Sequence, residues 1–529
     1  MNRFFLSLFL LAGSLGAADS HIWKVAGPPP DSWQRDRVAD LASRRKAVME
    51  QMGNKAILIL HAAEPRNYAG DVDWPYRQEN DFFYLTGIAQ EGSTLVLIPG
   101  ADKIREILFM PPSNPAQENW TGHIFTADEG RKISGIDTIW DARTFNSFLS
   151  TVMPRTAPVF AAAAATAGRG GRGKGGRGGA PAAPTIPVDL NSEFAKFIEL
   201  TRSDTAELYM LRERGVEYRR ESEFAAKLAE ADPKFPIKSP LQILDNLRSV
   251  KSPRELDLLK HAVDITAEAF QRVYALGVPG TPEYELQAQF EFTFLRRNAH
   301  WGYPCIVASG VNATTLHYET NKDTMKAGDL LLMDDAAEFD GYSVDVTRTI
   351  PVSGKFSKEQ ADIYRLVWGG QQAGIAAALP GKRNVDITAA ADKVMAEGLV
   401  KLGLMTDVNS KQQLAIWFNH GISHGIGLNV HDPGRSEFQP GMTITMEPGI
   451  YIRLDALDNL SKTSENEKFI AAIKPVFEKY KGIGVRIEDD VLITSAQAQV
   501  LSSAIPSKLE DVEAAVAQLR KALKSTPLP

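Results

Sequence analysis

The segment Leu330–Pro351, LLLMDDAAEFDGYSVDVTRTIP, determines how the rest of the chain can be arranged. Four apolar residues lead into Asp334, and the turn-forming pair Asp340-Gly341 separates them from a stretch in which apolar and polar residues alternate. This pattern predicts a β-hairpin with a two-residue loop. Pairing across that loop places the side chains of Asp334 and Asp345 on one face, as diagonal neighbours whose Cα atoms lie about 7–8 Å apart.

Carboxylates on a buried hairpin face need a positive partner, because an unpaired buried charge is costly. A metal ion between Asp334 and Asp345 would supply it. A salt bridge from Asp334 to Arg348, or a solvated hairpin tip, would serve as well, and the hairpin alone does not decide between these alternatives. Asp335 lies on the opposite face in this register and is not expected to take part.

Length and composition indicate a globular protein of more than one domain. The chain has 529 residues, and its apolar and charged fractions of 44% and 23% are ordinary. A net charge of −6 argues against broad binding of phosphate backbones, so we expect no nucleic-acid partner. The single cysteine, Cys305, excludes an intrachain disulfide.

Residues 1–18 have the features of a secretory signal peptide. Arg3 supplies the basic start, an apolar core follows, and the small residues GAA at 16–18 suit a cleavage site. The apolar run is short for a transmembrane helix, although an uncleaved anchor is the alternative. We therefore expect an exported protein, periplasmic or extracellular, without a stable membrane span.

The region 19–240 is predicted to form a small α/β domain, because helical and strand patterns alternate in it. A helix is expected at 36–52, strands at 55–61, 80–88, 93–98 and 105–110, and largely helical structure at 193–231. The segment 161–187 is rich in Ala, Gly, Arg and Pro, which cannot pack a core. We interpret it as a flexible inserted loop.

The region 241–515 is predicted to begin with two helices. SPRE at 252–255 is a helix start, with Pro at the first helical position, and the pattern continues to Gly277. A second helix near 284–298 precedes a strand at 306–309. A helical apolar stripe that suits core or subunit packing consists of Leu509, Val512, Val516, Leu519 and Leu523. Residues 516–529 are assigned to the end of this helix and a tail.

Three histidines lie close together in HGISHGIGLNVHD, residues 420–432. His420 and His424 are four residues apart, as in the helical zinc-protease motif, but Gly421 stands where that motif has its catalytic Glu. The three glycines of the segment also disfavour a helix. We predict a loop entering a strand, and the density of histidines indicates a chemical role.

Two later segments, 440–451 and 482–494, each alternate as a strand does. Glu447 in the first and Glu488 in the second lie on the face that the apolar neighbours avoid. A solvent-facing glutamate is the simpler interpretation of either residue alone. The intervening segment 453–481 is partly helical in pattern and is expected at the rim of the site.

The candidate metal ligands are Asp334, Asp345, His424, Glu447 and Glu488. Oxygen-rich ligation with one imidazole suits Mn²⁺, with Zn²⁺ or Co²⁺ as alternatives. Four carboxylates balance two divalent ions, and such a pair, about 3.5–4 Å apart, can generate hydroxide at neutral pH. We therefore expect two divalent metal ions.

The order Asp, Asp, His, Glu, Glu resembles that of the pita-bread metallopeptidases, which include methionine aminopeptidase, prolidase and Xaa-Pro aminopeptidase. The motifs DAAEFDGYSVDVTRT, HGISHGIGLNVHD, MEPGIYI and GVRIEDD carry the resemblance over most of 240–515. Upstream, ENDFFYLTGI resembles the N-terminal domain of Xaa-Pro aminopeptidases. The resemblance implies an α/β (α+β) protein, with a small N-terminal α/β domain and a C-terminal pita-bread (creatinase/methionine aminopeptidase-like) catalytic domain.

The resemblance also implies a role for each ligand position. Asp334 would hold one metal, Asp345 and Glu488 would bridge both, and His424 and Glu447 would hold the other. Glu447 would also shuttle the proton of the nucleophilic water.

Further residues match substrate-binding and assembly positions of the family. His317 matches a catalytic histidine, and His431 matches the histidine that steadies the scissile carbonyl. The residues matching or lying near the proline subsite are His420, Arg486 and Tyr451. Trp120 falls where the family has a tryptophan that reaches a neighbouring subunit's site, so a homo-oligomer, dimer or tetramer, is expected.

The resemblance implies a metal-dependent Xaa-Pro aminopeptidase, which removes an N-terminal residue that is followed by proline. Its partners would be peptides with proline at position two. The alternative is a prolidase, an Xaa-Pro dipeptidase, in which Arg435 would grip a free C-terminal carboxylate; a solvent-exposed loop arginine is the simpler interpretation of that residue. A non-catalytic binding module is less favoured, because all five ligand positions are filled.

Overall fold

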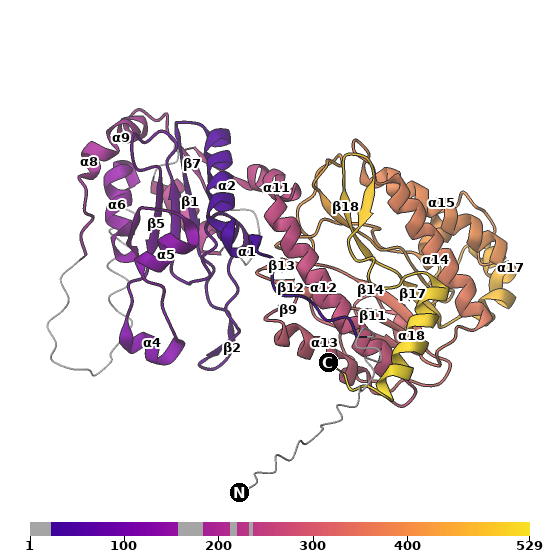
Figure 1. The fold of residues 1–529 in the computed structure, drawn as a ribbon. Helices are drawn as coiled ribbons and strands as arrows, with labels where there is room; N and C mark the ends of the chain where they lie inside the picture. The colour runs from indigo at the N-terminus through magenta and orange to yellow at the C-terminus, as the bar shows by residue number, and fades with distance from the viewer. Residues whose placement is uncertain (1–22, 157–183, 212–218, 232–235, 529) are drawn as a thin grey trace, which may run out of the picture.

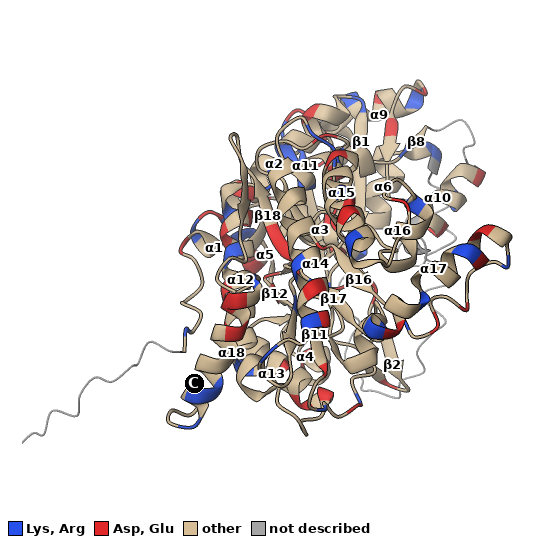
Figure 2. Cartoon of the chain, turned by 90° about the vertical axis from the view of Figure 1, so that its right-hand side faces the viewer, with Lys and Arg blue, Asp and Glu red and all other residues tan. Residues whose placement is uncertain are grey.

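The computed structural model describes residues 23–156, 184–211, 219–231 and 236–528, which form two domains side by side (Figure 1). The predicted signal peptide lies outside these residues, as does most of the predicted insertion at 161–187. Within the described ranges, no helix is both long and apolar enough to cross a membrane. Acidic and basic residues are interspersed over the face shown in Figure 2.

A six-stranded mixed sheet forms the centre of the N-terminal domain, with the strand order β6-β5-β4-β1-β7-β8. Its strands are β1 (Ala56–His61), β4 (Thr94–Leu97), β5 (Glu106–Met110), β6 (Ile139–Asp141), β7 (Glu207–Tyr209) and β8 (Ile237–Lys238). The helices of this domain are α1 (Ser32–Arg35), α2 (Arg37–Met52), α3 (Asn80–Thr86), α4 (Pro115–Thr121), α5 (Ala127–Ser134), α6 (Phe145–Val152), α8 (Leu190–Glu193), α9 (Ala195–Arg202) and α10 (Arg219–Ala231). A separate hairpin pairs β2 (Asn67–Ala69) with β3 (Val72–Asp73).

Strand β1 is apolar on both faces because helices cover both sides of the sheet (Figure 1). Leu58 and Leu60 pack with α2 and α3, in a cluster that continues into the core of the second domain. Ile57 and Ile59 pack with α6 and α9 on the other side. The two domains therefore share one hydrophobic core on the α2–α3 side of the sheet.

Two predictions for this domain need correction. The segment 80–88, predicted as a strand, is the helix α3. The carboxylate of Glu79 accepts hydrogen bonds from the backbone N–H groups of Asp81 and Phe82, and Gly87 ends the helix with φ 64°. The helical prediction for 193–231 is correct for α9 and α10, but β7 separates them as a strand of the central sheet.

The second domain contains helices on the outside of several small antiparallel sheets (Figure 1). Its helices are α11 (Leu241–Ser249), α12 (Pro253–Leu276), α13 (Glu283–Arg296), α14 (Lys358–Ala377), α15 (Asn384–Leu402), α16 (Lys411–Trp417), α17 (Ser464–Tyr480) and α18 (Leu509–Leu523). Its strands are β9 (His300–Trp301), β10 (Ile306–Ser309), β11 (Leu330–Asp334), β12 (Ala337–Phe339), β13 (Tyr342–Ser343), β14 (Thr347–Pro351), β15 (Thr443–Met446), β16 (Gly449–Tyr451), β17 (Gly484–Arg486), β18 (Asp489–Ile493) and β19 (Ala498–Val500).

The long helix α12 follows its sequence signals. Ser252 and Glu255 form a capping box, Pro253 is the first helical residue, and Gly277 is the C-cap. The helix packs against α13, α18 and the hairpin strands β12 and β13. The apolar stripe of α18 is buried in this contact, so its predicted packing role is confirmed.

The predicted hairpin register is confirmed. Phe339 pairs with Tyr342 next to the turn, and at the far end Asp334 pairs with Thr347, two residues from Asp345. Asp340, in the turn, has a φ of 51°, a conformation that Asp tolerates better than most residues. The local pattern therefore placed the two carboxylates correctly.

Each of the two later predicted strands is broken at its glutamate. Segment 440–451 forms β15 and β16, and segment 482–494 forms β17 and β18. Strand β15 pairs with β18, and β16 pairs with β17. Both pairs have the same register, which places Glu447 opposite Glu488 at the break. The backbone N–H of Glu447 donates to Ile422 O, and that of Glu488 donates to Thr347 O. These two hydrogen bonds connect the strand pair to the histidine segment and to the hairpin.

Candidate metal centre and active site

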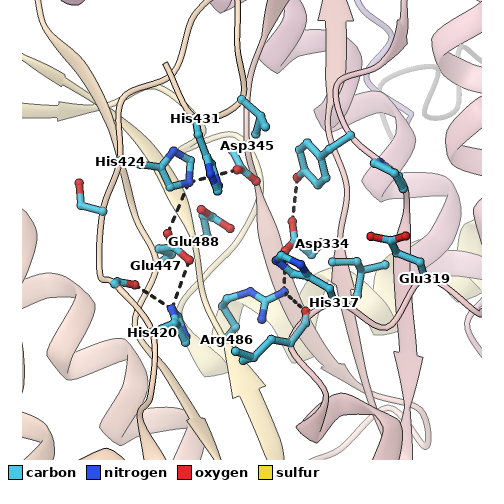
Figure 3. Close-up of a pocket in the computed structure, with 17 residues that line it drawn as sticks. His317, Glu319, Asp334, Asp345, His420, His424, His431, Glu447, Arg486 and Glu488 are labelled. Atoms are coloured by element: carbon cyan, nitrogen blue, oxygen red, sulfur yellow. Dashed lines mark hydrogen bonds and ion pairs between the residues drawn. The ribbon is translucent and has the colours of Figure 1, made fainter. Parts of the chain in front are cut away.

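A cavity of about 430 Å³ lies where these segments meet (Figure 3). It contains ten of the residues that the sequence and the resemblance singled out, or that neighbour them: His317, Glu319, Asp334, Asp345, His420, His424, His431, Glu447, Arg486 and Glu488. Of the predicted site residues, Tyr451 does not line the cavity but contacts it from behind, through hydrogen bonds to His420 and Arg486. Segments far apart in the sequence therefore converge on one site.

Three side chains are arranged to share one cation. Ligand atoms of Asp345, His424 and Glu488 all lie within 4.8 Å of one another. Glu447 Oε1 lies 3.4 Å from His424 Nε2. Oδ1 of Asp345 and Oε1 of Glu488 are buried and have no hydrogen-bond partner among the described residues. Buried carboxylate oxygens without partners are what a divalent metal would satisfy, so the donor set fits such an ion.

His424 presents one nitrogen to this group. Its Nδ1 lies 3.0 Å from Gly425 O, and since a carbonyl can only accept, Nδ1 must carry the proton. Nε2 is left with a free lone pair, 3.5 Å from Asp345 Oδ2. Burial, with His431 nearby, lowers the pKa of His424 to about 4, so the ring is neutral at physiological pH. A neutral imidazole with this tautomer is a competent metal ligand.

The carboxyl groups of Asp345, Glu447 and Glu488 resist ionisation in the absence of a cation. Burial raises the pKa of Glu447 to about 8, and Arg486 partly opposes this. Burial followed by the nearby carboxylates raises the pKa of both Asp345 and Glu488 well above its usual range. The interpretation of Glu447 and Glu488 as solvent-facing glutamates is therefore wrong, since both point into the cavity and Glu488 is buried.

Asp334 has a different environment. Its Oδ2 lies 2.5 Å from Arg486 Nη2, and its Oδ1 accepts a hydrogen bond of 2.7 Å from the Tyr303 hydroxyl. Arg348, one of the alternative partners considered for Asp334, instead pairs with Asp489 at 2.6 Å, because its side chain points to the opposite face of the hairpin. Asp335 is fully buried and does not line the cavity, as the register predicted.

A chain of hydrogen bonds runs along the Arg486 side of the cavity. Arg486 Nη1 donates to the Tyr451 hydroxyl at 2.9 Å, and the Tyr451 hydroxyl lies 2.9 Å from His420 Nε2. His420 Nδ1 lies 2.7 Å from Gly421 O and therefore carries the ring proton. Burial and Arg486 lower the pKa of His420 to about 4. Tyr451 thus donates to a neutral imidazole, and each group holds the next one in place.

His317 and His431 line the cavity and are exposed to solvent, and both are labelled in Figure 3. The His431 ring stacks at an angle on that of His424, with centroids 4.1 Å apart. His317 follows a short 3-10 turn after β10. The histidine segment 420–432 is non-helical as predicted, but its expected strand is reduced to isolated bridges from Gly425 to Asp432 and Ile444.

Sequence reasoning missed several supporting residues. Tyr303 lines the cavity, Thr347 Oγ1 donates to Glu488 Oε2 at 2.7 Å, and the Asp490 carboxylate accepts from the backbone N–H of Asp345 at 3.2 Å. Two aspartates follow Glu488 in the sequence, and this acidic pair could have indicated a supporting role for Asp490. Nothing local to Tyr303 indicates its role, because its partner lies on a strand 31 residues away.

Two expectations about the rim are not met. Arg435 contacts Ser249, Asn246 and Gln439 and does not line the cavity, so neither the carboxylate grip nor a free solvent-exposed arginine describes it. No residue of 453–481 lines the cavity, and α17 lies at the outer edge of the domain (Figures 1 and 2).

Comparison with known families gives two matches along the chain. Residues 257–495 match the model of metallopeptidase family M24, and residues 41–160 match the N-terminal domain of aminopeptidase P. Together they include every predicted metal ligand and the helix α3. The order of the two matches is the order of the two domains in the structure.

Individual proteins are similar over nearly the whole chain. The Xaa-Pro aminopeptidase of Escherichia coli K12 is 31% identical over 491 residues, which is 90% of this chain and 97% of that protein. Human Xaa-Pro aminopeptidase 3 is 28% identical, over 89% of this chain and 82% of the human protein. The structure of E. coli aminopeptidase P with the inhibitor Pro-Leu superimposes with a TM-score of 0.73 and 28% identity, covering 91% of this chain and 99% of that one.

Proposed function

Since the chain belongs to the Xaa-Pro aminopeptidases of metallopeptidase family M24, we propose that it hydrolyses the bond between an N-terminal residue and a following proline. The observation that carries this proposal is the clustering of ligand atoms from Asp345, His424 and Glu488 within 4.8 Å, beside Glu447. Such a cluster suits a metallopeptidase, and the arginine-lined side next to it suits recognition of a peptide.

We assign the metal ligands as Asp334, Asp345, His424, Glu447 and Glu488, and propose two divalent ions. Mn²⁺ is the preferred candidate because four of the five ligands are carboxylates, with Zn²⁺ or Co²⁺ as alternatives. When bound, the ions would polarise the scissile carbonyl and lower the pKa of water. To bind a metal ion, Asp334 would either release Arg486 or use an oxygen that already accepts a hydrogen bond from Arg486 or Tyr303.

The remaining residues would bind, orient and transfer protons. Glu447, whose pKa is raised by burial, is suited to accept the proton of the attacking water and pass it to the leaving amine. His431 and His317, on the open side of the cavity, would donate hydrogen bonds to the substrate's carbonyl group. His420 and Arg486, which Tyr451 holds from behind through hydrogen bonds, would form the wall of the proline subsite.

Export and self-association are part of the same proposal. The signal-like residues 1–18 favour a periplasmic or extracellular protein. Trp120 on α4 is 90% exposed, which is unusual for a tryptophan and suits contact with a second copy of the chain. We propose a dimer or tetramer, which light scattering of the purified protein would test; an active monomer would contradict it.

The test is hydrolysis of Ala-Pro-Ala, Ala-Pro and Ala-Ala-Ala, with and without Mn²⁺ after chelation. Release of Ala from Ala-Pro-Ala alone among the tripeptides, restored by metal, is expected. Equal cleavage of Ala-Ala-Ala would contradict proline specificity. Cleavage of Ala-Pro alone would identify a dipeptidase, and no metal-dependent cleavage of any peptide would overturn the proposed activity.

A further inference from the structure

The N-terminal domain contacts the histidine loop through a buried ionic network. Arg248, at the end of α11, pairs through Nη1 with Asp81 of α3 at 2.7 Å and through Nη2 with Asp432 at 2.5 Å. Lys251 Nζ lies 3.0 Å from the second oxygen of Asp432. All four side chains are at most 1% exposed. Two cations and two carboxylates therefore neutralise one another inside the protein, between the domains.

Asp432 also determines the shape of the loop that carries His431. Its carboxylate accepts from the backbone N–H of Asn429 at 3.1 Å, and its own N–H donates to Gly425 O at 2.8 Å. A Cβ atom on Gly427 would collide with this carboxylate. The loop is thus closed around the Asp432 side chain, and His431 is the residue adjacent to Asp432 in this loop.

A second set of contacts from the same part of the N-terminal domain reaches the loop from outside. Arg77 Nη2 donates to Leu428 O at 2.8 Å, and Asn80 Nδ2 donates to Asn429 Oδ1 at 2.5 Å. With Asp81, three residues within five positions of the N-terminal domain contact the loop directly or through Arg248. The N-terminal domain therefore contacts the segment that carries the site's histidines at several points.

We propose that Asp81 of the N-terminal domain is a positioning residue for His431, acting through Arg248 and Asp432. A buried ion pair adds little stability compared with apolar packing, but it requires a defined geometry, which suits positioning better than simple domain attachment. The inference rests on the proposed peptidase function, because His431 is assigned there to the substrate carbonyl. It makes the N-terminal domain a component of the active site rather than only an attached module.

The variant Asp81→Asn tests the inference, because it keeps the shape of the side chain and removes its charge. We expect kcat on Ala-Pro-Ala to fall at least about tenfold with little change in KM and with full metal content by elemental analysis. In a His431→Ala background the same change should reduce kcat less than about twofold, since its effect passes through His431. Arg37→Gln is the matched control, because Arg37 also joins the domains, through Asp340, without contacting the histidine loop.

A kcat of Asp81→Asn within about twofold of wild type, or an equal loss in the His431→Ala background, would overturn the inference. If Asp81→Asn does not fold, Arg77→Gln removes one of the outer contacts at a half-exposed side chain and should lower kcat about threefold; an unchanged kcat would count against the inference. Hydrogen exchange of residues 425–432 needs no activity, and it should accelerate in Asp81→Asn but not in Arg37→Gln. An inactive wild type would contradict the proposed function, whereas unchanged exchange in Asp81→Asn would contradict the positioning role.

Discussion

The two ends of the cavity solve the problem of buried charge in different ways. At the arginine end, Asp334 is paired with Arg486 and also accepts a hydrogen bond from Tyr303. At the carboxylate end, Asp345, Glu447 and Glu488 face one another and His424. In the described part of the chain, no lysine or arginine forms a salt bridge with those three carboxylates.

This difference indicates where a cation is needed. At the arginine end, Arg486 neutralises the negative charge of Asp334, so this end can serve as a rigid wall for substrate. At the carboxylate end, the negative charge is removed or balanced only when the carboxyl groups are protonated or when cations bind, because unpaired buried charges are costly. Four experiments would test this difference between the two ends of the cavity.

Glu488→Ala should have the largest effect, since it removes the most deeply buried carboxylate of the carboxylate end. We expect loss of bound metal and a fall in kcat/KM for Ala-Pro-Ala of at least about 10⁴-fold. Elemental analysis and steady-state kinetics measure the two quantities. Retention of two metal ions per chain with activity within about tenfold of wild type would remove Glu488 from the metal site.

The metal-free protein should lose stability as the pH rises from about 6.5 to 8, above the range in which His420 and His424, whose pKa values are lowered to about 4, add stability with rising pH. The pKa of Glu447 is raised from 4.5 to about 8 in the folded protein, so the folded state binds the proton more tightly than the unfolded state. This contribution is fully present below pH 4.5 and is lost as the pH rises towards about 8. Thermal or urea unfolding of chelated protein should show a loss of about 2 kcal/mol between pH 6.5 and 8, because Glu447 contributes up to about 1.4 kcal/mol per pH unit and the raised pKa values of Asp345 and Glu488 add to it.

The same titration with saturating Mn²⁺ is the control for this prediction. Bound cations would stabilise the ionised carboxylates, so the metal-loaded protein should show a nearly flat profile between pH 6.5 and 8. Stability of the chelated protein that stays constant or increases over this range would contradict the assignment of an uncompensated carboxylate end.

Arg486→Lys should have an intermediate effect at the arginine end. Lysine retains the charge, but it lacks the planar guanidinium group whose two terminal nitrogens donate to Tyr451 and to Asp334. We expect kcat/KM for Ala-Pro-Ala to fall about 30-fold, or about 2 kcal/mol, with unchanged metal content. Arg435→Lys, outside the cavity, is the matched control. A 30-fold loss accompanied by loss of metal would place Arg486 with the carboxylate end instead.

Asp335→Asn should have the smallest effect, although Asp335 adjoins Asp334. Burial raises the pKa of Asp335 well above its usual range and so favours the neutral carboxyl group, which an amide of the same shape can replace. We expect kcat/KM within about twofold of wild type and a free energy of unfolding within about 1 kcal/mol at pH 7. A loss comparable with that of Asp334→Asn would mean that the two neighbours act together.

The elements with strong local signals were predicted well. Helix α12 carries its own capping box and terminal glycine, and the hairpin at 330–351 carries its turn and alternation. In both, the determining interactions lie within a few residues of sequence. The five candidate ligands could be named because each stands in a distinctive motif, and all of them line one cavity in the structure, namely Asp334, Asp345, His424, Glu447 and Glu488.

Other features depend on contacts between segments that are distant in the sequence, so local patterns could not predict them. Helix α3 was predicted as a strand because its aromatic residues favour strands, whereas its cap and its packing with α2 favour a helix. The breaks at Glu447 and Glu488 arise because their backbone N–H groups bond to segments 25 and 141 residues away. Which arginine neutralises Asp334, and how Asp81 reaches the histidine loop, likewise depend on through-space geometry, since a charge has no preferred partner until the fold brings one within range.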